Sequence, residues 1–197
     1  MLNYLKFLII LLITNYCWSV PPLTANKNNY LVFADEKSFI QSCSPEDNAV
    51  ATNVDNFLEL NLRHDFDEDM ETLITNGNIT MKVDIPYGIQ LALDMEIFMW
   101  KRGRWEKTVY SIRRDDFCAS AFDPVEFWYP LTEQIREEDR ICPPKKGTVY
   151  RFDNLENRVE LNNIAAFDIE GDYKIVAHFI AGDYISCISS YANVWKN

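Results

Sequence analysis

Alternation of apolar and polar residues constrains the fold of this chain more than any other feature of its sequence. Between Ile89 and Met99 every odd position is apolar, whereas most even positions are polar. Successive side chains of a β-strand point to opposite faces of a sheet, so this period predicts a strand with one buried face. The same alternation occupies 79–85 and 172–181, and shorter candidate strands lie at 148–153 and 158–161. The sequence therefore predicts an all-β protein.

Turn signals separate the predicted strands. Asn76-Gly77 precedes the strand at 79–85, Lys101–Arg104 leads into a returning strand at 105–112, and Gly182-Asp183 leads into a last strand at 184–195. Glycine and asparagine favour turns because they tolerate backbone conformations that other residues avoid. Strands joined by short turns predict a single-domain antiparallel β cup or sandwich.

The first 19 residues have the features of a signal peptide. Lys6 precedes a short apolar run at 7–13, and Cys17 and Ser19 place small residues at positions −3 and −1 of a cleavage site. We therefore expect residues 1–19 to be a leader and residues 20–197 to form the mature domain. Secretion is the predicted localisation, with the lysosomal lumen as the alternative. No later segment has the ~18 consecutive apolar residues of a membrane span, so no stable membrane insertion is expected.

The cysteines and a glycosylation motif agree with that compartment. Four cysteines follow the leader, and an even number in an oxidising compartment predicts two disulfides. Four cysteines allow three pairings, and the sequence pattern does not choose among them. Asn78-Ile79-Thr80 is an N-glycosylation sequon, which predicts an exposed, glycosylated turn at Asn78.

Charge and composition exclude several classes of protein. The chain has 19 basic and 30 acidic residues, for a net charge of −11. Such a surface repels nucleic-acid phosphates, so no nucleic acid is expected among its partners. A hydrophobic content of 48% is high enough to bury a core and argues against disorder.

Catalytic signals are weak in this sequence. The run from His64 to Asp69 is acidic, but it has no glycine of the kind that a calcium loop needs, so we interpret it as a solvated turn. His178 lies in an apolar strand and is interpreted as a core or cavity histidine. No nucleophile elbow or phosphate-binding glycine loop occurs. The sequence predicts a protein that is not an enzyme, with no cofactor, no metal and no catalytic residue.

One segment departs from the alternation. Residues 122–131, between Cys118 and Cys142, are rich in aromatics and bracketed by prolines, which predicts one short helix or an aromatic loop. Two interpretations stay open for its side chains. They form either a plug of core aromatics or a mobile apolar lip, with Phe127 and Trp128 at the mouth of a cavity.

Methionines on apolar strand faces are candidate ligand contacts, because their side chains adapt to irregular apolar shapes. Periodicity cannot distinguish a hollow core from a filled one. The candidate ligand-binding residues of the strands are Met81, Met95, Ile97, Met99 and Phe179.

Five short motifs follow one another along the chain: Cys43 with Ala49-Val50, Gly77–Met81, Cys142–Thr148, Gly171–Ile175 and Cys187-Ile188. They resemble, in the same order, the C-x5-A-V, G-N-V-T-L, C-P-x-K-x-G-T, G-N-Y-R-I and C-I motifs of the lysosomal ganglioside activator family, a group of ML-related lipid-binding proteins. Within that group the chain most resembles the insect CheB chemosensory branch. It departs from the activator itself in lacking two of its disulfides.

This resemblance implies a one-domain β cup with a hydrophobic cavity between antiparallel sheets. It also implies the disulfides Cys43–Cys187 and Cys118–Cys142. The implied function is to bind and present a lipid or another long-chain hydrophobic ligand, such as a hydrocarbon or pheromone-like cue in chemosensory fluid. A receptor or a hydrolase would then be the protein partner. Two alternatives remain: a lipid-presenting activator of a lysosomal glycolipid hydrolase, and an extracellular interaction domain with a filled core.

Overall fold

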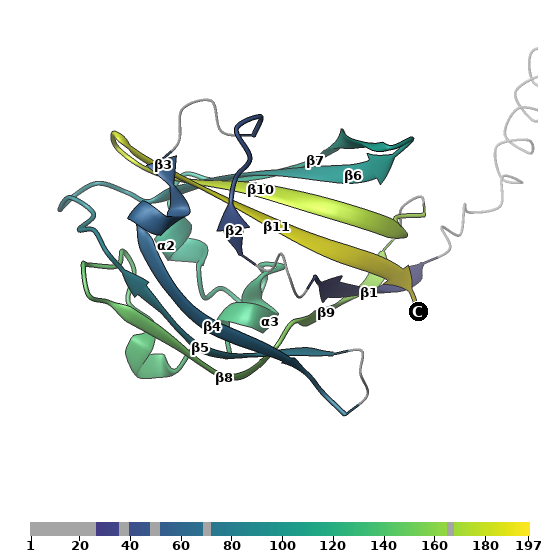
Figure 1. The fold of residues 1–197 in the computed structure, drawn as a ribbon, viewed down its shortest axis with the longest axis horizontal. Helices are drawn as coiled ribbons and strands as arrows, with labels where there is room; N and C mark the ends of the chain where they lie inside the picture. The colour runs from purple at the N-terminus through teal and green to yellow at the C-terminus, as the bar shows by residue number, and fades with distance from the viewer. Residues whose placement is uncertain (1–26, 36–39, 48–51, 69–71, 165–167) are drawn as a thin grey trace, which may run out of the picture.

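Two β-sheets face each other in the computed structural model of this chain (Figure 1), which describes residues 27–35, 40–47, 52–68, 72–164 and 168–197. The expected leader at 1–19 lies outside the described residues. Short helices flank one side of the sheets, and two disulfides join distant segments. The prediction of an all-β antiparallel fold with two disulfides is confirmed, and the described residues contain two short α-helices where the sequence predicted one short helix or an aromatic loop. Within the described residues, no helix is both long enough and apolar enough to cross a membrane.

The larger sheet is built around two long hairpins. Its main strands lie in the order β7-β6-β10-β11-β1-β9, and all neighbours in this path are antiparallel. The other edge of β11 pairs in turn with β3, β2 and β1 along its length. The strands are β1 (Asn28–Ala34), β2 (Gln41–Ser42), β3 (Thr52–Asn53), β6 (Ala92–Lys101), β7 (Arg104–Arg114), β9 (Arg158–Ile164), β10 (Gly171–Ala181) and β11 (Tyr184–Lys196).

The turns of both hairpins lie where the sequence predicts them. Arg102 and Gly103 connect β6 to β7 with φ angles of 53° and 80°. Two successive positive φ values are typical of the tight turns that match the twist of a hairpin. Gly182, with a φ of 62°, begins the turn between β10 and β11. The alternation therefore predicted these four strands correctly, apart from shifts of a few residues at their ends.

The smaller sheet has three strands in the order β4-β5-β8, and all its pairs are antiparallel. Its strands are β4 (Leu58–Phe66), β5 (Leu73–Met81) and β8 (Val149–Glu156). The prediction of a turn at Asn76-Gly77 is wrong, because β5 continues through both residues. Gly77 has a φ of 124° and lies at a register shift between β5 and β8, so its glycine serves a β-bulge in the middle of the sheet.

The acidic run after residue 63 also differs from its prediction. His64 and Phe66 belong to β4 rather than to a turn, and His64 Nδ1 lies 2.7 Å from Thr75 Oγ1 on β5. The chain leaves the strand only at Asp67, and Asp69 lies outside the described residues. Exposed and half-buried residues alternate along β4 as far as His64, which is the pattern of an edge strand with one solvated face, and the residues that follow, up to Glu68, are exposed.

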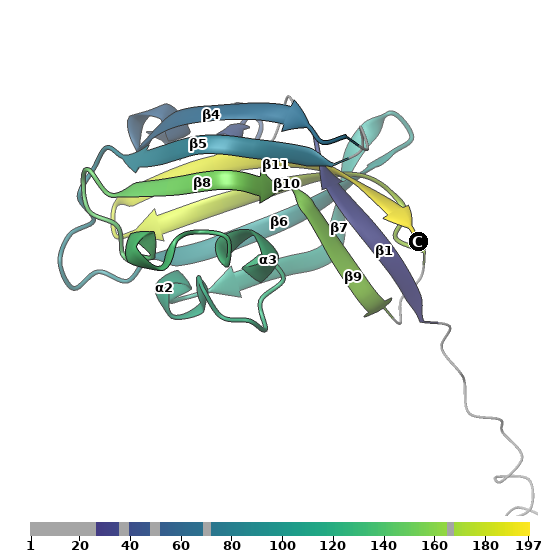
Figure 2. The same ribbon diagram turned by 90° about the horizontal axis from the view of Figure 1, so that it is seen from below.

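The aromatic segment at 122–131 and the residues on either side of it form short helices instead of a strand. They are α2 (Phe117–Ser120), α3 (Tyr129–Thr132) and the 3₁₀ helix η3 (Glu137–Asp139); a further 3₁₀ helix, η2 (Val54–Asn56), precedes β4. The Asp116 side chain accepts a hydrogen bond from the Ala119 amide and caps α2. Figure 2 shows α2 and α3 beside β8, so that the helices and the smaller sheet together cover one face of the larger sheet.

The two disulfides connect separate parts of the fold. Cys43–Cys187 joins the segment after β2 to the middle of β11. Cys118–Cys142 joins α2 to the residues after η3 and closes the aromatic segment into a loop. Both pairings are those that the family resemblance implies. Cross-links over 144 and 24 residues restrict the unfolded chain, which stabilises the folded state by roughly 5 and 3 kcal/mol in the chain-entropy description.

Candidate functional site

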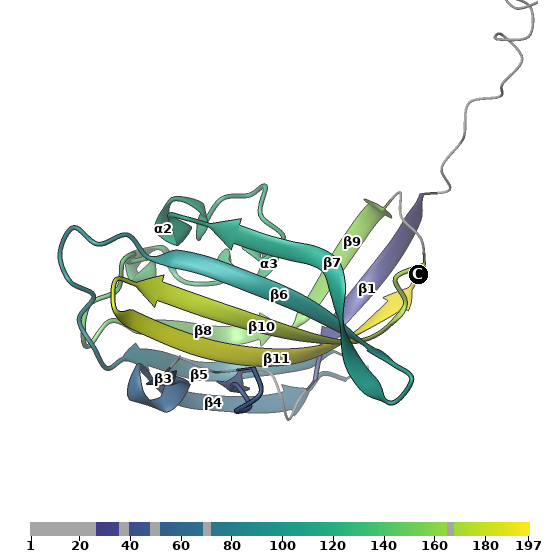
Figure 3. The same cartoon turned by 90° about the horizontal axis from the view of Figure 1, so that it is seen from above.

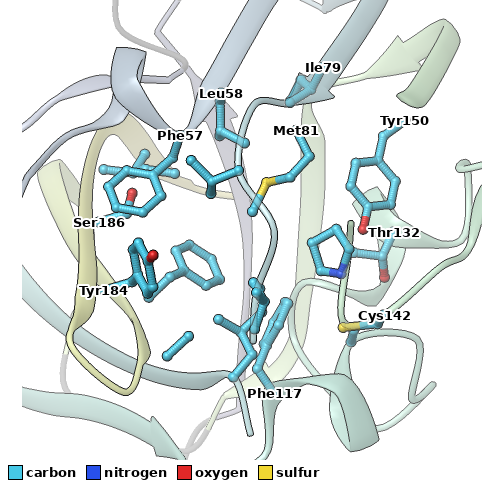
Figure 4. Close-up of a pocket in the computed structure, with 18 of the residues that line it drawn as sticks. Phe57, Leu58, Ile79, Met81, Phe117, Thr132, Cys142, Tyr150, Tyr184 and Ser186 are labelled. Carbon is cyan, nitrogen blue, oxygen red and sulfur yellow. The ribbon is translucent and has the colours of Figure 1, made fainter. Parts of the chain in front are cut away.

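An apolar cavity of about 280 Å³ lies between the two sheets, at the end of the fold where the β10–β11 turn is found. Figure 4 shows side chains from both sheets and from the helical segment pointing into it. Its volume is close to the lower end of the ~300–1,000 Å³ typical of small-molecule pockets. The cavity is the candidate functional site of this protein.

The smaller sheet supplies one wall of the cavity. Ile79 and Met81 of β5 point inward together with Phe152 of β8, and all three are buried. Val83 and Ile85 also line the cavity, although β5 ends at Met81. The strand predicted at 79–85 therefore ends at Met81, and beyond it the chain bends at Val83 so that Val83, Asp84 and Ile85 all reach the cavity.

The larger sheet supplies the opposite wall. Phe179 and Ala181 of β10 face the cavity, as do Tyr184, Ser186 and Ile188 of β11. Positions two apart share a face of a strand, which explains why alternate residues of each strand reach the same space. Phe57, from the segment between η2 and β4, lies 6.3 Å from the Tyr184 ring in an edge-to-face contact and narrows this end.

The disulfide-closed segment supplies the third wall. Phe117, Phe122 and Ile135 point into the cavity, and Cys142 of the disulfide lines it directly. The neighbouring Pro144 also belongs to the lining. The Cys118–Cys142 bond therefore joins the two ends of this wall to each other, and Cys142 is part of the surface that a ligand would touch.

The chemistry of the lining is almost entirely apolar. Among the described lining residues, Asp84 alone carries a formal charge at neutral pH, and its carboxylate accepts a hydrogen bond from the Lys146 amide at 3.0 Å. The Tyr150 hydroxyl donates to the Ile141 carbonyl, and burial raises the pKa of its phenol to about 12. Tyr150 is thus neutral at physiological pH. Such a lining solvates hydrocarbon and offers little that would hold a charged molecule.

Of the seven predicted ligand contacts, Met81 and Phe179 line this cavity. Met95 packs against the buried cluster of Leu93 and Ala177, which adjoins the cavity through Phe179, but Met95 itself does not line the cavity. Ile97 and Met99 pack farther along the sheet, around Tyr173. All three lie on the Phe179 face, but each two-residue step moves a side chain ~6.6–6.8 Å along the strand, so they do not reach the cavity.

The two predicted lip residues lie outside the lining and differ from each other. Trp128 is only 7% exposed; its ring packs 5.7 Å from that of Phe117, and its Nε1 donates to the Ser120 carbonyl. Phe127 is 38% exposed. For Trp128 the plug interpretation therefore holds, because the segment folds back and buries this ring beneath α2. Whether the seven residues contact a ligand stays a prediction.

An ion pair fastens the aromatic segment to the larger sheet. Arg114, near the end of β7, donates from Nε and Nη2 to the two carboxylate oxygens of Glu126, at 2.6 and 2.8 Å. The Arg114 guanidinium also lies 5.7 Å from the Trp128 ring. The sequence offered no signal for this contact, because neither residue belongs to a motif. The Arg114–Glu126 ion pair limits how far the neighbouring Phe127 and Trp128, the predicted lip, can move.

Several lining residues were missed in the sequence. Leu58 begins β4, where Leu58, Leu60 and Leu62 alternate with polar residues, so the pattern used elsewhere would have found this strand. Phe57 and Ile40 lie in irregular segments, where no period predicts the direction of a side chain. Asn78, the glycosylation candidate, is half-buried on β5 rather than in a turn, on the opposite face from Ile79.

Metal binding has no support in the described part of the chain, where no group of three or more His, Cys, Asp or Glu side chains lies close enough together to hold an ion. Comparison with models of known protein families and with curated proteins gave no match. The function of the cavity must therefore be argued from its geometry and chemistry.

Proposed function

We propose that this protein is a secreted, non-enzymatic carrier that binds a hydrophobic molecule between its two sheets and presents it in an extracellular fluid. The observation that carries this proposal is the apolar cavity of about 280 Å³, whose walls come from both sheets and from a disulfide-closed segment. A filled β-sandwich would not contain a cavity of that size, because protein interiors are normally packed without such voids.

The chemistry of the lining favours a lipid or hydrocarbon as the ligand. Each methylene buried from water contributes ~0.8 kcal/mol, before the loss of ligand freedom is subtracted. A molecule with one alkyl chain or a compact apolar body fits the volume better than a ligand with several long chains. The flexible side chain of Met81 can adapt to such a shape, and the rings of Phe117 and Phe179 add apolar surface.

Secretion is the second part of the proposal. The leader-like residues 1–19 and the two disulfides support it, since disulfides persist in oxidising compartments. The resemblance to the ganglioside activator family and its insect chemosensory branch supports a pheromone-like cue as the ligand. Cys142 and Pro144, from the motif that carries this resemblance, line the cavity.

Native mass spectrometry of the disulfide-intact mature protein tests this function. We expect a defined adduct of a few hundred daltons after exposure to a mixed lipid and hydrocarbon extract, and its mass distinguishes a hydrocarbon cue from a glycolipid. The Ala181→Phe variant fills the cavity and should lose the adduct. Val109→Phe, at a position on β7 that is 92% exposed, is the matched control and should keep it. Absence of an adduct from the intact protein, or an equal adduct on both variants, would contradict the proposal.

A further inference from the structure

A second hollow, of about 440 Å³, lies on the other face of the larger sheet. Tyr191 of β11, which lines it, pairs with Lys174 of β10, whereas Phe179 of β10 lines the apolar cavity. Residues 174 and 179 of one strand point to opposite faces, because they are separated by an odd number of positions. The hollow therefore lies mainly on the side of the sheet opposite the apolar cavity, although Tyr173 and Ala192 of its lining belong to the cavity side. Figure 3 looks onto that opposite face.

Aromatic rings form the walls of this hollow. Trp100 and Trp105 lie opposite each other in the β6–β7 hairpin, with ring centroids 5.0 Å apart and ring planes at 64°. Trp105 reaches across the sheet to Tyr191, at 5.4 Å and 61°. Rings that cross at such angles do not stack into a flat platform. They form walls at an angle to each other, which suits a rounded group more than a flat one.

Acidic side chains complete the hollow. Asp172 of β10 is exposed, and its Oδ1 accepts a hydrogen bond from Asn193 Nδ2 at 2.6 Å, which fixes the direction of the carboxylate. Asp35 also lines the hollow, and its amide donates to the Tyr191 carbonyl at 3.0 Å. The site therefore combines aromatic walls with two carboxylates, on a protein whose net charge is −11.

The nearest lysine does not occupy this space. Lys174 Nζ is buried against Asp47, whose two carboxylate oxygens accept its hydrogen bonds at 2.8 and 2.9 Å. It lies over the Trp105 ring, 6.0 Å from the ring centroid. Lys174 is paired with Asp47, and the charged residues that line the hollow, Asp35 and Asp172, are both acidic.

We propose that this hollow binds an alkylated ammonium group of the choline type. Aromatic faces attract such cations through their quadrupoles, and carboxylates add a longer-range attraction. A bare metal ion is a poor alternative, since no group of three or more metal-ligating side chains is found among the described residues. The proposal goes beyond the carrier function and does not depend on it. The cation could be free in solution or could belong to a phosphocholine lipid headgroup.

Titration of the mature, uniformly ¹⁵N-labelled protein with choline chloride tests this site by NMR. We expect the indole N–H signals of Trp100 and Trp105 to shift with choline, while those of Trp128 and Trp195 stay fixed. The neutral isostere 3,3-dimethylbutan-1-ol has the same shape without the charge. Its affinity for the protein should be lower than that of choline by a factor of about ten or more. Equal shifts with the isostere, or no choline-dependent shift at either indole, would overturn the proposal.

Two variants and two matched controls locate the binding. Trp105→Ala and Asp172→Asn should each weaken choline binding about tenfold. The controls Trp195→Ala and Asp183→Asn change residues of the same types that do not line the hollow, and choline should bind them as it binds the wild type. Asp172→Asn preserves the shape of the side chain, so it remains informative if Trp105→Ala fails to fold. Unchanged binding to Asp172→Asn would remove the carboxylate from the proposal and overturn it.

The source of the cation is resolved by a second measurement. Co-sedimentation with phosphatidylcholine vesicles that choline abolishes would assign the site to a lipid headgroup. Choline binding without vesicle binding would assign it to a free cation. The cavity-filling variant Ala181→Phe should bind choline normally, so failure of the carrier proposal and failure of this one can be distinguished.

Discussion

Arg114 and Glu126 form a two-point ion pair that joins the end of β7 to the aromatic segment. The Glu126 side chain is 9% exposed and that of Arg114 is 39% exposed, so the pair is shielded from water mainly on the carboxylate side. Hydrogen bonds from Arg114 to Glu126 raise the pKa of the guanidinium, which is charged at every physiological pH. The pair therefore links one wall of the apolar cavity to β7 at every physiological pH.

Glu126→Gln should loosen that wall. The amide keeps the size of the side chain, but its nitrogen cannot accept, so one of the two hydrogen bonds from Arg114 is lost and the other loses the carboxylate charge. We therefore expect the free energy of unfolding to fall by about 1–2 kcal/mol. Amide hydrogen exchange across α2 and α3 should become faster, and ligand should dissociate faster. Glu106→Gln is the control, because its partner Arg104 is 72% exposed and the pair should contribute at most ~1 kcal/mol. Unchanged exchange in the segment would show that other contacts hold the wall.

Trp128→Ala should destabilise the whole fold rather than change ligand loading alone. The indole is buried between α2 and the inner face of the larger sheet, and removing a buried tryptophan typically costs about 3–5 kcal/mol. Trp195→Ala, at a position that is 60% exposed, should change the free energy of unfolding by less than about 1 kcal/mol. Urea denaturation of both variants measures the difference. A small effect for Trp128→Ala would restore the interpretation of this residue as part of a lip.

The strands of the larger sheet were the most predictable part of the fold, because apolar residues occupy alternate positions along their inner faces. The β6–β7 and β10–β11 hairpins followed from alternation and from glycine at the turns. The candidate site was less predictable. Alternation tells which face of a strand a residue occupies but not how far along the sheet it lies. Met81 and Met99 were therefore indistinguishable in the sequence, although only Met81 lines the cavity.

Asn76-Gly77 illustrates a second limit. The dipeptide favours a turn, but pairing of β5 with strands on both sides outweighs that local preference. A glycine suits a bulge as well as a turn, since both require a backbone that other residues adopt poorly. Contacts between residues distant in sequence, such as Arg114–Glu126, leave no periodic signal at all.

Gly77→Ala should be strongly destabilising. Gly77 has a φ of 124°, and a Cβ at this position would lie 2.0 Å from the Asn61 carbonyl oxygen on β4. Backbone strain and displacement of that strand should together lower the free energy of unfolding by about 3 kcal/mol. Gly88→Ala is the control, since its φ of 81° is also positive but its Cβ would meet open space. It should cost about 1 kcal/mol. Similar thermal shifts for both variants would mean that the contact with Asn61 relaxes easily.

The Asp47–Lys174 pair should make stability depend on acidic pH. Burial by itself raises the pKa of Asp47, but hydrogen bonds from Lys174 and Ser44 and the charge of Lys174 outweigh burial and hold the pKa below its ordinary value. A lowered folded-state pKa means that ionised Asp47 stabilises the fold fully above the ordinary pKa of ~3.9. That contribution is lost as the pH falls through the lower, folded-state value.

Asp47→Asn tests this dependence directly. At pH 7 the variant should be less stable by about 3 kcal/mol, because Lys174 is left buried beside a neutral group. The difference from wild type should begin to shrink as the pH falls below about 4, where the unfolded chain takes up a proton at Asp47. It should disappear below the lowered folded-state pKa, where Asp47 of the folded wild type is neutral as well. Asp153→Asn is the control, since that carboxylate is 74% exposed and its variant should follow the wild type at every pH. Urea denaturation from pH 7 to pH 2.5 measures both curves. A constant difference between Asp47→Asn and wild type over this range would show that the pair does not contribute through its charge.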